Sequence, residues 1–530
     1  MPHFTVTHWD IAILLVYVLG TRIVIGWYAA LKARNADTAG YFLADRNMTW
    51  PIIGFSFYVA NMSGSTFVAL PASAYYSGIS VYNYEWLPAA ILIFFAVFIL
   101  PHYHSNKLFT VPQFLERRFN ARVRTGFSWF LLVANIFIDA AAALYAGAVI
   151  LQTLFPAVPV WLTVLLIALL AGVYTFFGGL RAVVLNDVIQ AVLILIGGSI
   201  IAVLAWHQIP SWSVIQDTVA AQKLSLFQPA DDPVMPWPGI FSGVLVIGIY
   251  FWCMNQFVIQ RSLAARTLNH ARWGALFAGI LKLPNLFLLI LPGIIAIYLY
   301  PNLERPDMVF PILAFDLLPV GWRGLMLAAL AAAILSSLEA ILNSTATLLT
   351  MDIIKPRWPQ LSEQALVKTG KAATLGFMLI AALWAPQITF FPTLWQYLQS
   401  ILSYVTPPVV AIFLLGLFWK RGNAFGAQCT LWLGLGLGVA GWIGNEIMHV
   451  SRLQYLYAAG LLFIASIAIF VVASLLTSAP APEKLQGTIW RWQQWRDESA
   501  VLKHGTLLTN YRFLSAVLLA ITAVILIVWR

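Results

Sequence analysis

Long apolar segments recur along the whole chain and alternate with short polar connections. Many of them reach the roughly 20 residues that a helix needs to cross the hydrocarbon core of a bilayer. The pattern therefore predicts an all-α polytopic membrane protein with about fourteen transmembrane helices. The predicted spans are residues 9–31, 49–72, 78–101, 122–154, 160–178, 184–206, 238–260, 273–300, 322–353, 367–389, 393–419, 425–448, 453–477 and 509–529.

Three longer polar segments interrupt this alternation. Residues 208–237 are polar and bounded by proline, and we expect an extracellular loop that contains a short helix. Residues 300–320 are expected to form a second outer loop. Residues 480–506 are rich in Gln, Trp and charged residues, so we expect them to lie along the cytoplasmic surface before the last span.

Two of the spans contain polar residues and glycines where a regular helix is unfavourable. The second span places Asn61, Ser63, Gly64, Ser65 and Thr66 together in the middle of the membrane. Glycine costs about 1 kcal/mol relative to alanine inside a helix, and Ser and Asn compete for backbone hydrogen bonds. An unwound turn would expose carbonyl groups to a ligand, whereas the alternative interpretation is a small-residue packing face.

The seventh span shows a similar pattern, because Gly243 to Gly248 precede an aromatic and amide cluster from Tyr250 to Gln256. Each interrupted span begins a group of five spans. Because five is an odd number, the two groups have opposite orientations in the membrane. This outline predicts a 5+5 inverted repeat with broken helices, which is typical of transporters. The predicted parts are an N-terminal helix and loop (1–48), the two repeats (49–206 and 238–419), the extracellular loop (207–237) and accessory helices (420–530).

Composition supports the membrane interpretation and charge distribution adds an orientation. The chain is 61% hydrophobic and 9% charged, whereas soluble domains have roughly 25% charged residues. The net charge of +10 is concentrated in alternate loops, so we expect contact with anionic lipid and no nucleic-acid partner. The opposite loops hold only Lys223, Arg305, Arg323, Arg452 and Arg530. The positive-inside rule then predicts a multi-pass protein of the cell's inner (plasma) membrane, with its N-terminus outside. We expect a monomer or a weak oligomer.

Two adjacent hydroxyls, Ser336 and Ser337, stand in an apolar segment that is predicted to span the membrane. Polar groups at this depth must be paired or line a cavity. Neutral oxygens beside carbonyls from loosened helix suit a small cation such as sodium. The alternative is that both serines are helix-packing residues.

Several strings of residues resemble those of the sodium:solute symporter family, most closely its sodium/sugar cotransporters of the galactose and glucose types. They are residues 84–86, 178–190, 255–265, 281–283, 328–338, 342–352, 397–400 and 407–420. The resemblance covers residues from about 40 to 425. It implies a leucine-transporter-type core and one sodium site. The implied ligands are the carbonyls of Val59, Met62 and Ala333 and the hydroxyls of Ser336 and Ser337.

The resemblance also implies a site for a sugar. Glu85, Lys282 and Gln399 match the polar contacts, Phe251 takes the place of an aromatic platform beside Trp252, and Thr66 lies nearby. Leu70, Tyr84 and Trp395, together with Phe251, match gate positions. A buried acid–base pair is costly unless compensated, so Glu85 and Lys282 could alternatively form a structural ion pair.

Five charged or altered positions leave details open. Asp187 could stabilise the cation without binding it, or could instead pair with Arg181 at a helix end. Thr66 replaces the usual Gln or His, while Gly248 and Asp139 each replace Asn, which leaves the particular sugar undetermined. Glu339 could contribute to a second sodium site, accept a proton or pair with a base.

The resulting hypothesis is a sodium-driven symporter that imports a monosaccharide or related polyol by alternating access. One alternative is the same fold with another solute, such as a sialic acid, an amino acid or a different carboxylate. A second alternative is a membrane sensor that binds a solute without moving it. We expect no enzymatic activity, because no nucleophile–base pair with His shares a span.

Overall fold

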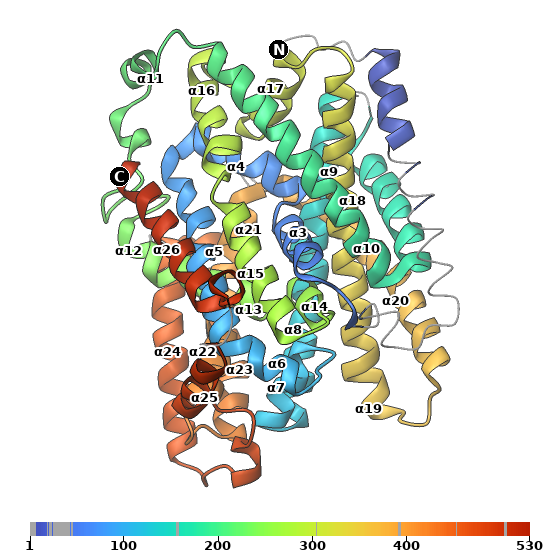
Figure 1. Ribbon diagram of the computed structural model, residues 1–530, viewed down its shortest axis with the longest axis vertical. Coiled ribbons are helices and arrows are strands. Elements are labelled where there is room, and N and C mark those ends of the chain that lie inside the picture. Colours follow the sequence, from blue (N-terminus) through green and yellow to red (C-terminus); the bar gives the residue numbers. More distant parts are fainter. Residues whose placement is uncertain are drawn as a thin grey trace.

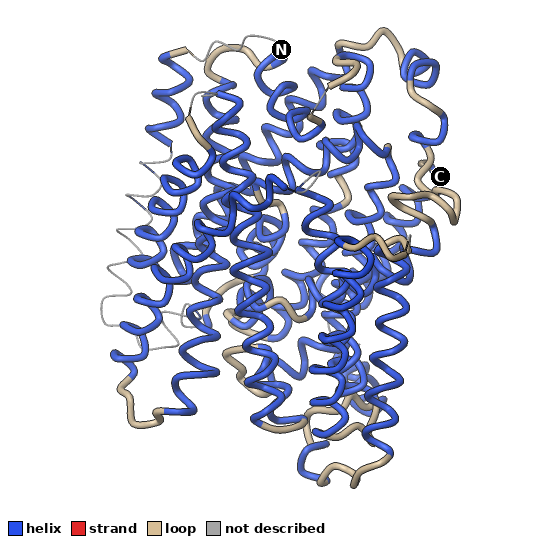
Figure 2. Tube along the Cα trace, turned by 180° about the vertical axis from the view of Figure 1, so that it is seen from behind, coloured by secondary structure: helices blue, strands red, loops and turns tan. Residues whose placement is uncertain are grey.

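The computed structural model describes residues 7–17, 20, 24, 43, 46–154, 158–303, 305–390, 394–451, 453–502 and 506–529. Within these ranges every named element is a helix, and Figure 2 shows the helices packed side by side. The all-α prediction is therefore confirmed. The predicted span 9–31 lies mostly outside the described residues, and only His8–Tyr17 is seen as a helix from it.

The helices of the first half are α3 (Trp50–Asn61), α4 (Gly64–Ser77), α5 (Asn83–Phe94), α6 (Leu100–Ser105), α7 (Val111–Arg118), α8 (Ala121–Val133), α9 (Ala141–Leu154), α10 (Val160–His207), α11 (Trp212–Thr218), α12 (Trp237–Gly239), α13 (Leu245–Cys253) and α14 (Gln256–Leu263). Those of the second half are α15 (Leu268–Lys282), α16 (Leu291–Leu299), α17 (Val309–Leu317), α18 (Trp322–Leu348), α19 (Lys355–Arg357), α20 (Glu363–Trp384), α21 (Leu394–Val405), α22 (Pro407–Phe418), α23 (Ala424–Trp442), α24 (Tyr455–Leu475), α25 (Trp492–Leu502) and α26 (Tyr511–Val528).

Among the described residues nine helices are long and apolar enough to cross a membrane, and three bent pairs raise the number to as many as twelve. The pair α3 and α4 bends by 58°, and the helices that end and begin around Met254 bend by 46°. Both bends fall inside the spans that the sequence predicts to be interrupted.

A third bend, of 47° between α21 and α22, was not predicted. Its cause is the pair Pro407 and Pro408 at the start of α22, because proline has no amide hydrogen and clashes with the preceding turn. The predicted spans 160–178 and 184–206 both belong to α10, and the backbone between them is helical.

The polar connections gather at the two ends of the molecule. Figure 1 shows α11 and α16 at the upper end and α6, α7 and α25 at the lower end. At the lower end Arg46 donates to the carbonyl of Lys107 at 2.8 Å, and Lys484 donates to the carbonyl of Glu116 at 3.2 Å. Loops that the sequence predicts on one side of the membrane thus lie together.

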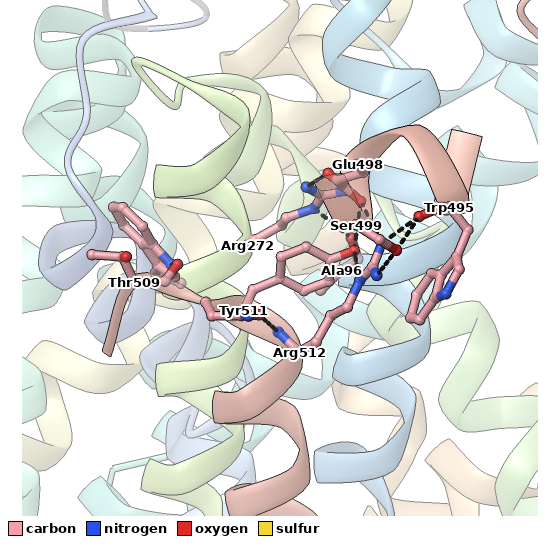
Figure 3. Close-up of polar contacts among 10 residues, drawn as sticks. Ala96, Arg272, Trp495, Glu498, Ser499, Thr509, Tyr511 and Arg512 are labelled. Atoms are coloured by element: carbon pink, nitrogen blue, oxygen red, sulfur yellow. Dashed lines mark hydrogen bonds and ion pairs between the residues drawn. The ribbon is translucent and has the colours of Figure 1, made fainter. Parts of the chain in front are cut away.

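The segment 480–506 contains the short helix α25, which is fastened to two spans. Glu498 of α25 pairs with Arg272 of α15 and with Arg512 of α26, and it accepts a hydrogen bond from Tyr511 at 2.6 Å (Figure 3). Arg272 also donates to the carbonyl of Ala96 at 3.0 Å, so these contacts tie α25 to the core of the bundle.

Candidate functional site

The break between α3 and α4 frees backbone carbonyls. In a regular helix the amide of Ser63 would donate to Val59, but here it donates to Asn61 at 2.8 Å. The amide of Thr66 likewise donates to Ser63 at 3.0 Å instead of to Met62. The carbonyls of Val59 and Met62 therefore lose their helical partners, and a carbonyl in this state is available to a cation.

Helix α18 packs directly against this break. A Cβ atom on Gly64 would lie 2.1 Å from Cγ1 of Ile334, so only glycine allows the observed approach. Ala333, Ser336 and Ser337 lie within three residues of Ile334 on α18, and all three are buried. The structure thus brings together the two segments that carry the five predicted sodium ligands. Whether these oxygens bind sodium stays a prediction.

Asp187 of α10 lies at the centre of a buried polar network. It accepts hydrogen bonds from Ser56 of α3 and Ser336 of α18, and it forms an ion pair with Arg261 of α14 at 3.0 Å. Asp187 and Arg261 are both almost fully buried, so each charge compensates the other. The observed partner is Arg261, and the side chain of Arg181, considered from sequence, lies outside the described residues.

Next to the break lies a central cavity of about 130 Å³. One enclosed water needs roughly 10–15 Å³, so the cavity has room for a solute with on the order of ten heavy atoms. Nine of the predicted residues line it: Thr66, Tyr84, Glu85, Asp139, Phe251, Trp252, Ser337, Trp395 and Gln399. Ser337 is the member of the predicted sodium site that reaches this cavity, so the ion and solute regions adjoin.

Lys282 does not line the cavity but lies behind it. Its ammonium group pairs with Glu85 and donates to the side chain of Asn61, and it is fully buried. Asn285 also donates to Glu85 and accepts a hydrogen bond from Tyr58 at 2.9 Å. Lys282 therefore holds Glu85 and Asn61 toward the cavity, which corresponds to the structural ion pair that the sequence left open.

Gln399 of α21 carries an acceptor without a partner beside the solute region. It is 8% exposed and lines the cavity, and its Oε1 has no hydrogen-bond partner among the described residues. A buried acceptor without a donor costs roughly 1–3 kcal/mol, so a donor from a solute would relieve this cost.

Three of the predicted gate residues, Tyr84, Phe251 and Trp395, line the cavity, and the fourth, Leu70, does not. Tyr84 and Trp395 pack edge to face with ring centroids 5.1 Å apart, and Phe251 and Trp252 do the same at 5.1 Å on another wall. Leu70, by contrast, is fully buried in α4 and does not line the cavity. Aromatic pairs of this kind present flat apolar faces next to the polar groups.

The positions that depart from the sugar cotransporter pattern fall on the cavity wall. Thr66, Gly248 and Asp139 all line it. Asp139 lies in a π-helical stretch, η4 (Ala134–Ala140), and the side-chain amide of Asn255 donates to its carboxylate at 3.5 Å. Such bulges occur frequently at functional sites. Glu339 is buried in α18 and does not line the cavity.

Three lining or supporting residues were not among the predicted site residues. Asn61 accepts the hydrogen bond from Lys282, Ser63 caps α4, and Asn285 joins Tyr58 to Glu85. Asn61 and Ser63 lie in the polar cluster of the second span, which was the available signal. Asn285 follows Lys282 by three residues, and nothing in the sequence distinguished it.

A polytopic helical protein whose broken helices meet at a central cavity beside freed carbonyls is a secondary transporter. Comparison with known families gives the particular family. The model of the sodium:solute symporter family matches residues 41–434, and the chain belongs to this family. Sodium is accordingly the coupled ion.

Relatives and solved structures agree with this assignment. The chain is 32% identical to sodium/glucose cotransporter 4 of Danio rerio over 94% of this chain and 83% of that protein. It is 32% identical to sodium/myo-inositol cotransporter 2 of Oryctolagus cuniculus (91% and 78%) and 35% identical to the sodium/glucose cotransporter of Vibrio parahaemolyticus (79% and 82%). A solved Na⁺-coupled sialic acid symporter, 22% identical, has the same fold with a TM-score of 0.75 over 89% of this chain and 99% of that one.

Proposed function

We propose that the protein imports a neutral monosaccharide or related polyol together with sodium, by alternating access. The observation that carries this proposal is the chemistry of the central cavity. Its lining has two carboxylates, Glu85 and Asp139, and the free acceptor of Gln399, and it includes no cationic side chain among the described residues. Polyol hydroxyls donate to such acceptors, and the rings of Phe251 and Trp395 can pack on the face of a sugar ring.

The relatives support the same solute class. Their names specify glucose and myo-inositol, both of which are neutral cyclic polyols. A carboxylate solute would require an unpaired positive group on the cavity wall, and none lies there among the described residues, because Lys282 stands behind the wall and already compensates Glu85. We therefore favour a polyol over the sialic acid carried by the structural neighbour.

For the ion we propose the carbonyls of Val59, Met62 and Ala333 and the hydroxyls of Ser336 and Ser337. Sodium bound there would join the loosened turn of α3 and α4 to α18. Asn61 in this turn accepts the hydrogen bond from Thr66 at 2.6 Å, and both residues line the solute cavity. Ordering of the turn by sodium would therefore improve the solute site, and by thermodynamic reciprocity the solute would tighten sodium binding.

We further propose that the lower, basic end of the molecule is cytoplasmic, as the positive-inside rule requires, and that the protein resides in the plasma membrane. It is a transporter, and we propose no enzymatic reaction and no nucleic-acid partner. For its oligomeric state we propose a monomer or weak oligomer.

The test is uptake of radiolabelled solutes into proteoliposomes that contain the purified protein. A panel of hexoses, inositols, amino acids and sialic acid is compared in sodium and in choline buffer. We expect sodium-dependent accumulation of a hexose or inositol. Uptake of a carboxylate solute alone would refute the polyol proposal, and equal uptake in choline would refute the sodium site. Binding without counterflow would indicate a sensor.

A further inference from the structure

A polar pocket lies beside α25, at the lower end of the molecule where α6 and α7 also lie (Figure 1). Its volume is about 250 Å³, and its lining includes Gln486, Arg491, Gln494 and Asp497. Since one enclosed water needs roughly 10–15 Å³, the pocket has room for on the order of twenty heavy atoms. We call it the α25 pocket.

Two opposite charges in the α25 pocket have no partner within the described part of the chain. Arg491 and Asp497 are exposed, and neither side chain forms an ion pair or a hydrogen bond there. The side chain of Gln494 accepts a hydrogen bond from the backbone amide of Arg491 at 3.4 Å. The complementary ligand carries an anionic group for Arg491 and a cationic hydrogen-bond donor for Asp497.

A continuous series of aromatic rings leads from the membrane-spanning helices to this pocket. Phe98 belongs to the candidate span Ile79–Ser105, and Phe418 ends α22. The ring of Phe98 packs against Phe418 with centroids 5.6 Å apart and against Trp490 at 5.1 Å. Trp490 packs in turn against Trp492 at 4.9 Å. We call these four residues the aromatic track.

The aromatic track is open to the surroundings at the rings of Phe418, which is 41% exposed, and Trp492, which is 67% exposed. Tryptophan is enriched where the hydrocarbon of a bilayer meets its head groups. Arg491 stands between Trp490 and Trp492 in the chain, so the track adjoins the charged pocket. Apolar span, aromatic boundary and charged pocket therefore follow one another in the order of the parts of a phospholipid.

The segment that forms the pocket is fixed to the rest of the protein. The amide of Trp490 donates to the carbonyl of Leu417 at 3.0 Å, and Nδ1 of His102 donates to the carbonyl of Gly487 at 2.9 Å. Glu498 fastens α25 to α15 and α26 (Figure 3). A pocket whose walls are already held needs little ordering when a ligand binds.

We propose that the α25 pocket and the aromatic track bind one phosphatidylethanolamine molecule from the leaflet at this end of the protein. Arg491 donates to the phosphate, Asp497 accepts from the ammonium group, and the glycerol and upper acyl chains lie on Phe418 and Trp492. The ammonium group has three N–H donors, whereas choline has none and the glycerol head group has no positive charge. The site lies apart from the central cavity, so this inference is independent of the solute and the ion.

The experiment is native mass spectrometry of the purified full-length protein in detergent. Phosphatidylethanolamine, phosphatidylcholine and phosphatidylglycerol with identical acyl chains are titrated separately, and the affinity of the first bound lipid is compared. We expect phosphatidylethanolamine to bind most tightly. Arg491→Gln should weaken all three lipids by about fivefold, as expected for loss of an exposed ion pair.

Two further variants separate the parts of the lipid. Asp497→Asn should weaken phosphatidylethanolamine by about the same factor and leave phosphatidylglycerol unchanged, because only the former has an ammonium group. Trp492→Ala should weaken all three lipids, since the aromatic track contacts the parts that they share. An unchanged melting temperature shows that each variant is folded.

The matched controls are Arg357→Gln, Glu483→Gln and Trp432→Ala. Arg357 of α19 and Glu483 are exposed, Trp432 of α23 is 61% exposed, and none of the three lines the pocket. Equal affinity for the three lipids, tighter binding of phosphatidylglycerol, or equal effects of variants and controls would overturn the inference. Displacement of the lipid by soluble phosphoethanolamine would also overturn it, because the acyl chains would then contribute nothing. None of these outcomes bears on sodium-dependent uptake.

Discussion

Ser337 belongs at once to the proposed ion site and to the wall of the solute cavity. Its hydroxyl donates to the carbonyl of Ala333 at 2.9 Å, and its side chain lines the cavity, as Ser63 and Ser65 also do. One side chain could therefore contact both ligands, so that binding of one ligand directly affects binding of the other.

We predict that Ser337→Ala abolishes sodium-dependent uptake, because a carbon cannot replace an oxygen ligand of sodium. The measurement is initial uptake in proteoliposomes over a range of sodium concentrations. Ser466→Ala is the matched control, since Ser466 is a buried serine on α24 whose hydroxyl also donates to a carbonyl four residues earlier. Unaltered sodium dependence in Ser337→Ala would remove this residue from the ion site.

For Gln399→Ala we predict a five- to tenfold rise in the half-saturating polyol concentration. Loss of one solute hydrogen bond is worth about 1–1.5 kcal/mol, and 1.4 kcal/mol corresponds to tenfold. Sodium binding measured without solute should be unchanged, because Gln399 belongs to the solute side. An unchanged half-saturation value would mean that Gln399 makes no contact with the solute.

The sequence singles out groups by their chemistry but does not show which way each side chain points, and the binding roles of these residues stay predictions. Nine predicted residues do line one cavity. Lys282, however, lies behind Glu85, and Leu70 is buried in α4 without reaching the cavity. The pairing of Asp187 with Arg261 joins residues 74 positions apart, and no local pattern in a single sequence reveals such a contact.

At the scale of elements, the close approach of α4 to α18 depends on Gly64. We predict that Gly64→Ala shifts α4 away from Ile334, costs about 1–3 kcal/mol in stability and raises the sodium concentration needed for half-maximal uptake. Gly376→Ala on α20 is the control, because a Cβ there meets no atom within 4 Å and should be neutral or slightly stabilising. Equal stability and equal sodium dependence of the two variants would show that the close approach of α4 to α18 is unimportant for sodium binding.

The helix α25 depends on Glu498. Burial raises the pKa of Glu498, but Arg272, Tyr511 and Arg512 outweigh it and hold this pKa below its usual range. Its stabilising contribution is therefore present above a pH of about 4.3, the ordinary value for Glu, and is lost as pH falls further. Between pH 6 and 8 the melting temperature should not change because of this group.

We predict that Glu498→Gln destabilises the protein by about 1–3 kcal/mol, since Arg272, 2% exposed, loses its counter-charge. The effect is below that of a fully buried pair because Glu498 is 27% exposed. Thermal unfolding in detergent measures the loss. Glu483→Gln, an exposed glutamate of the same connecting segment, should leave the melting temperature unchanged.

Element-level prediction was limited by proline inside apolar runs. The polar clusters correctly located the breaks near Met62 and Met254, because Gly, Ser and Asn disfavour regular helix. The bend before Pro407 was missed, since the surrounding residues are uniformly apolar and only the Pro pair signals it. Of the first predicted span, the helix His8–Tyr17 lies among the described residues.

At the scale of the whole molecule, coupling to sodium makes transport electrogenic. One sodium ion carried with a neutral polyol moves one positive charge, which is worth about 2.3 kcal/mol per 100 mV. We predict that an inside-negative potential of this size increases accumulation roughly 50-fold over that with no potential. The measurement is uptake with potassium-diffusion potentials of either sign. Accumulation that ignores the potential would contradict one net charge per solute.

All three bent helix pairs contribute residues to the wall of the central cavity: Asn61 and Ser65, Trp252 and Phe257, and Gln399 and Leu402. The amide protons near Met62, Met254 and Thr406 lie where the regular helical ladder is weakest, so they should exchange with deuterated solvent faster than those of neighbouring turns. Joint addition of sodium and cargo would slow this exchange at three places far apart in the sequence. Mass spectrometry of the corresponding peptides would then report whether both ligands are bound.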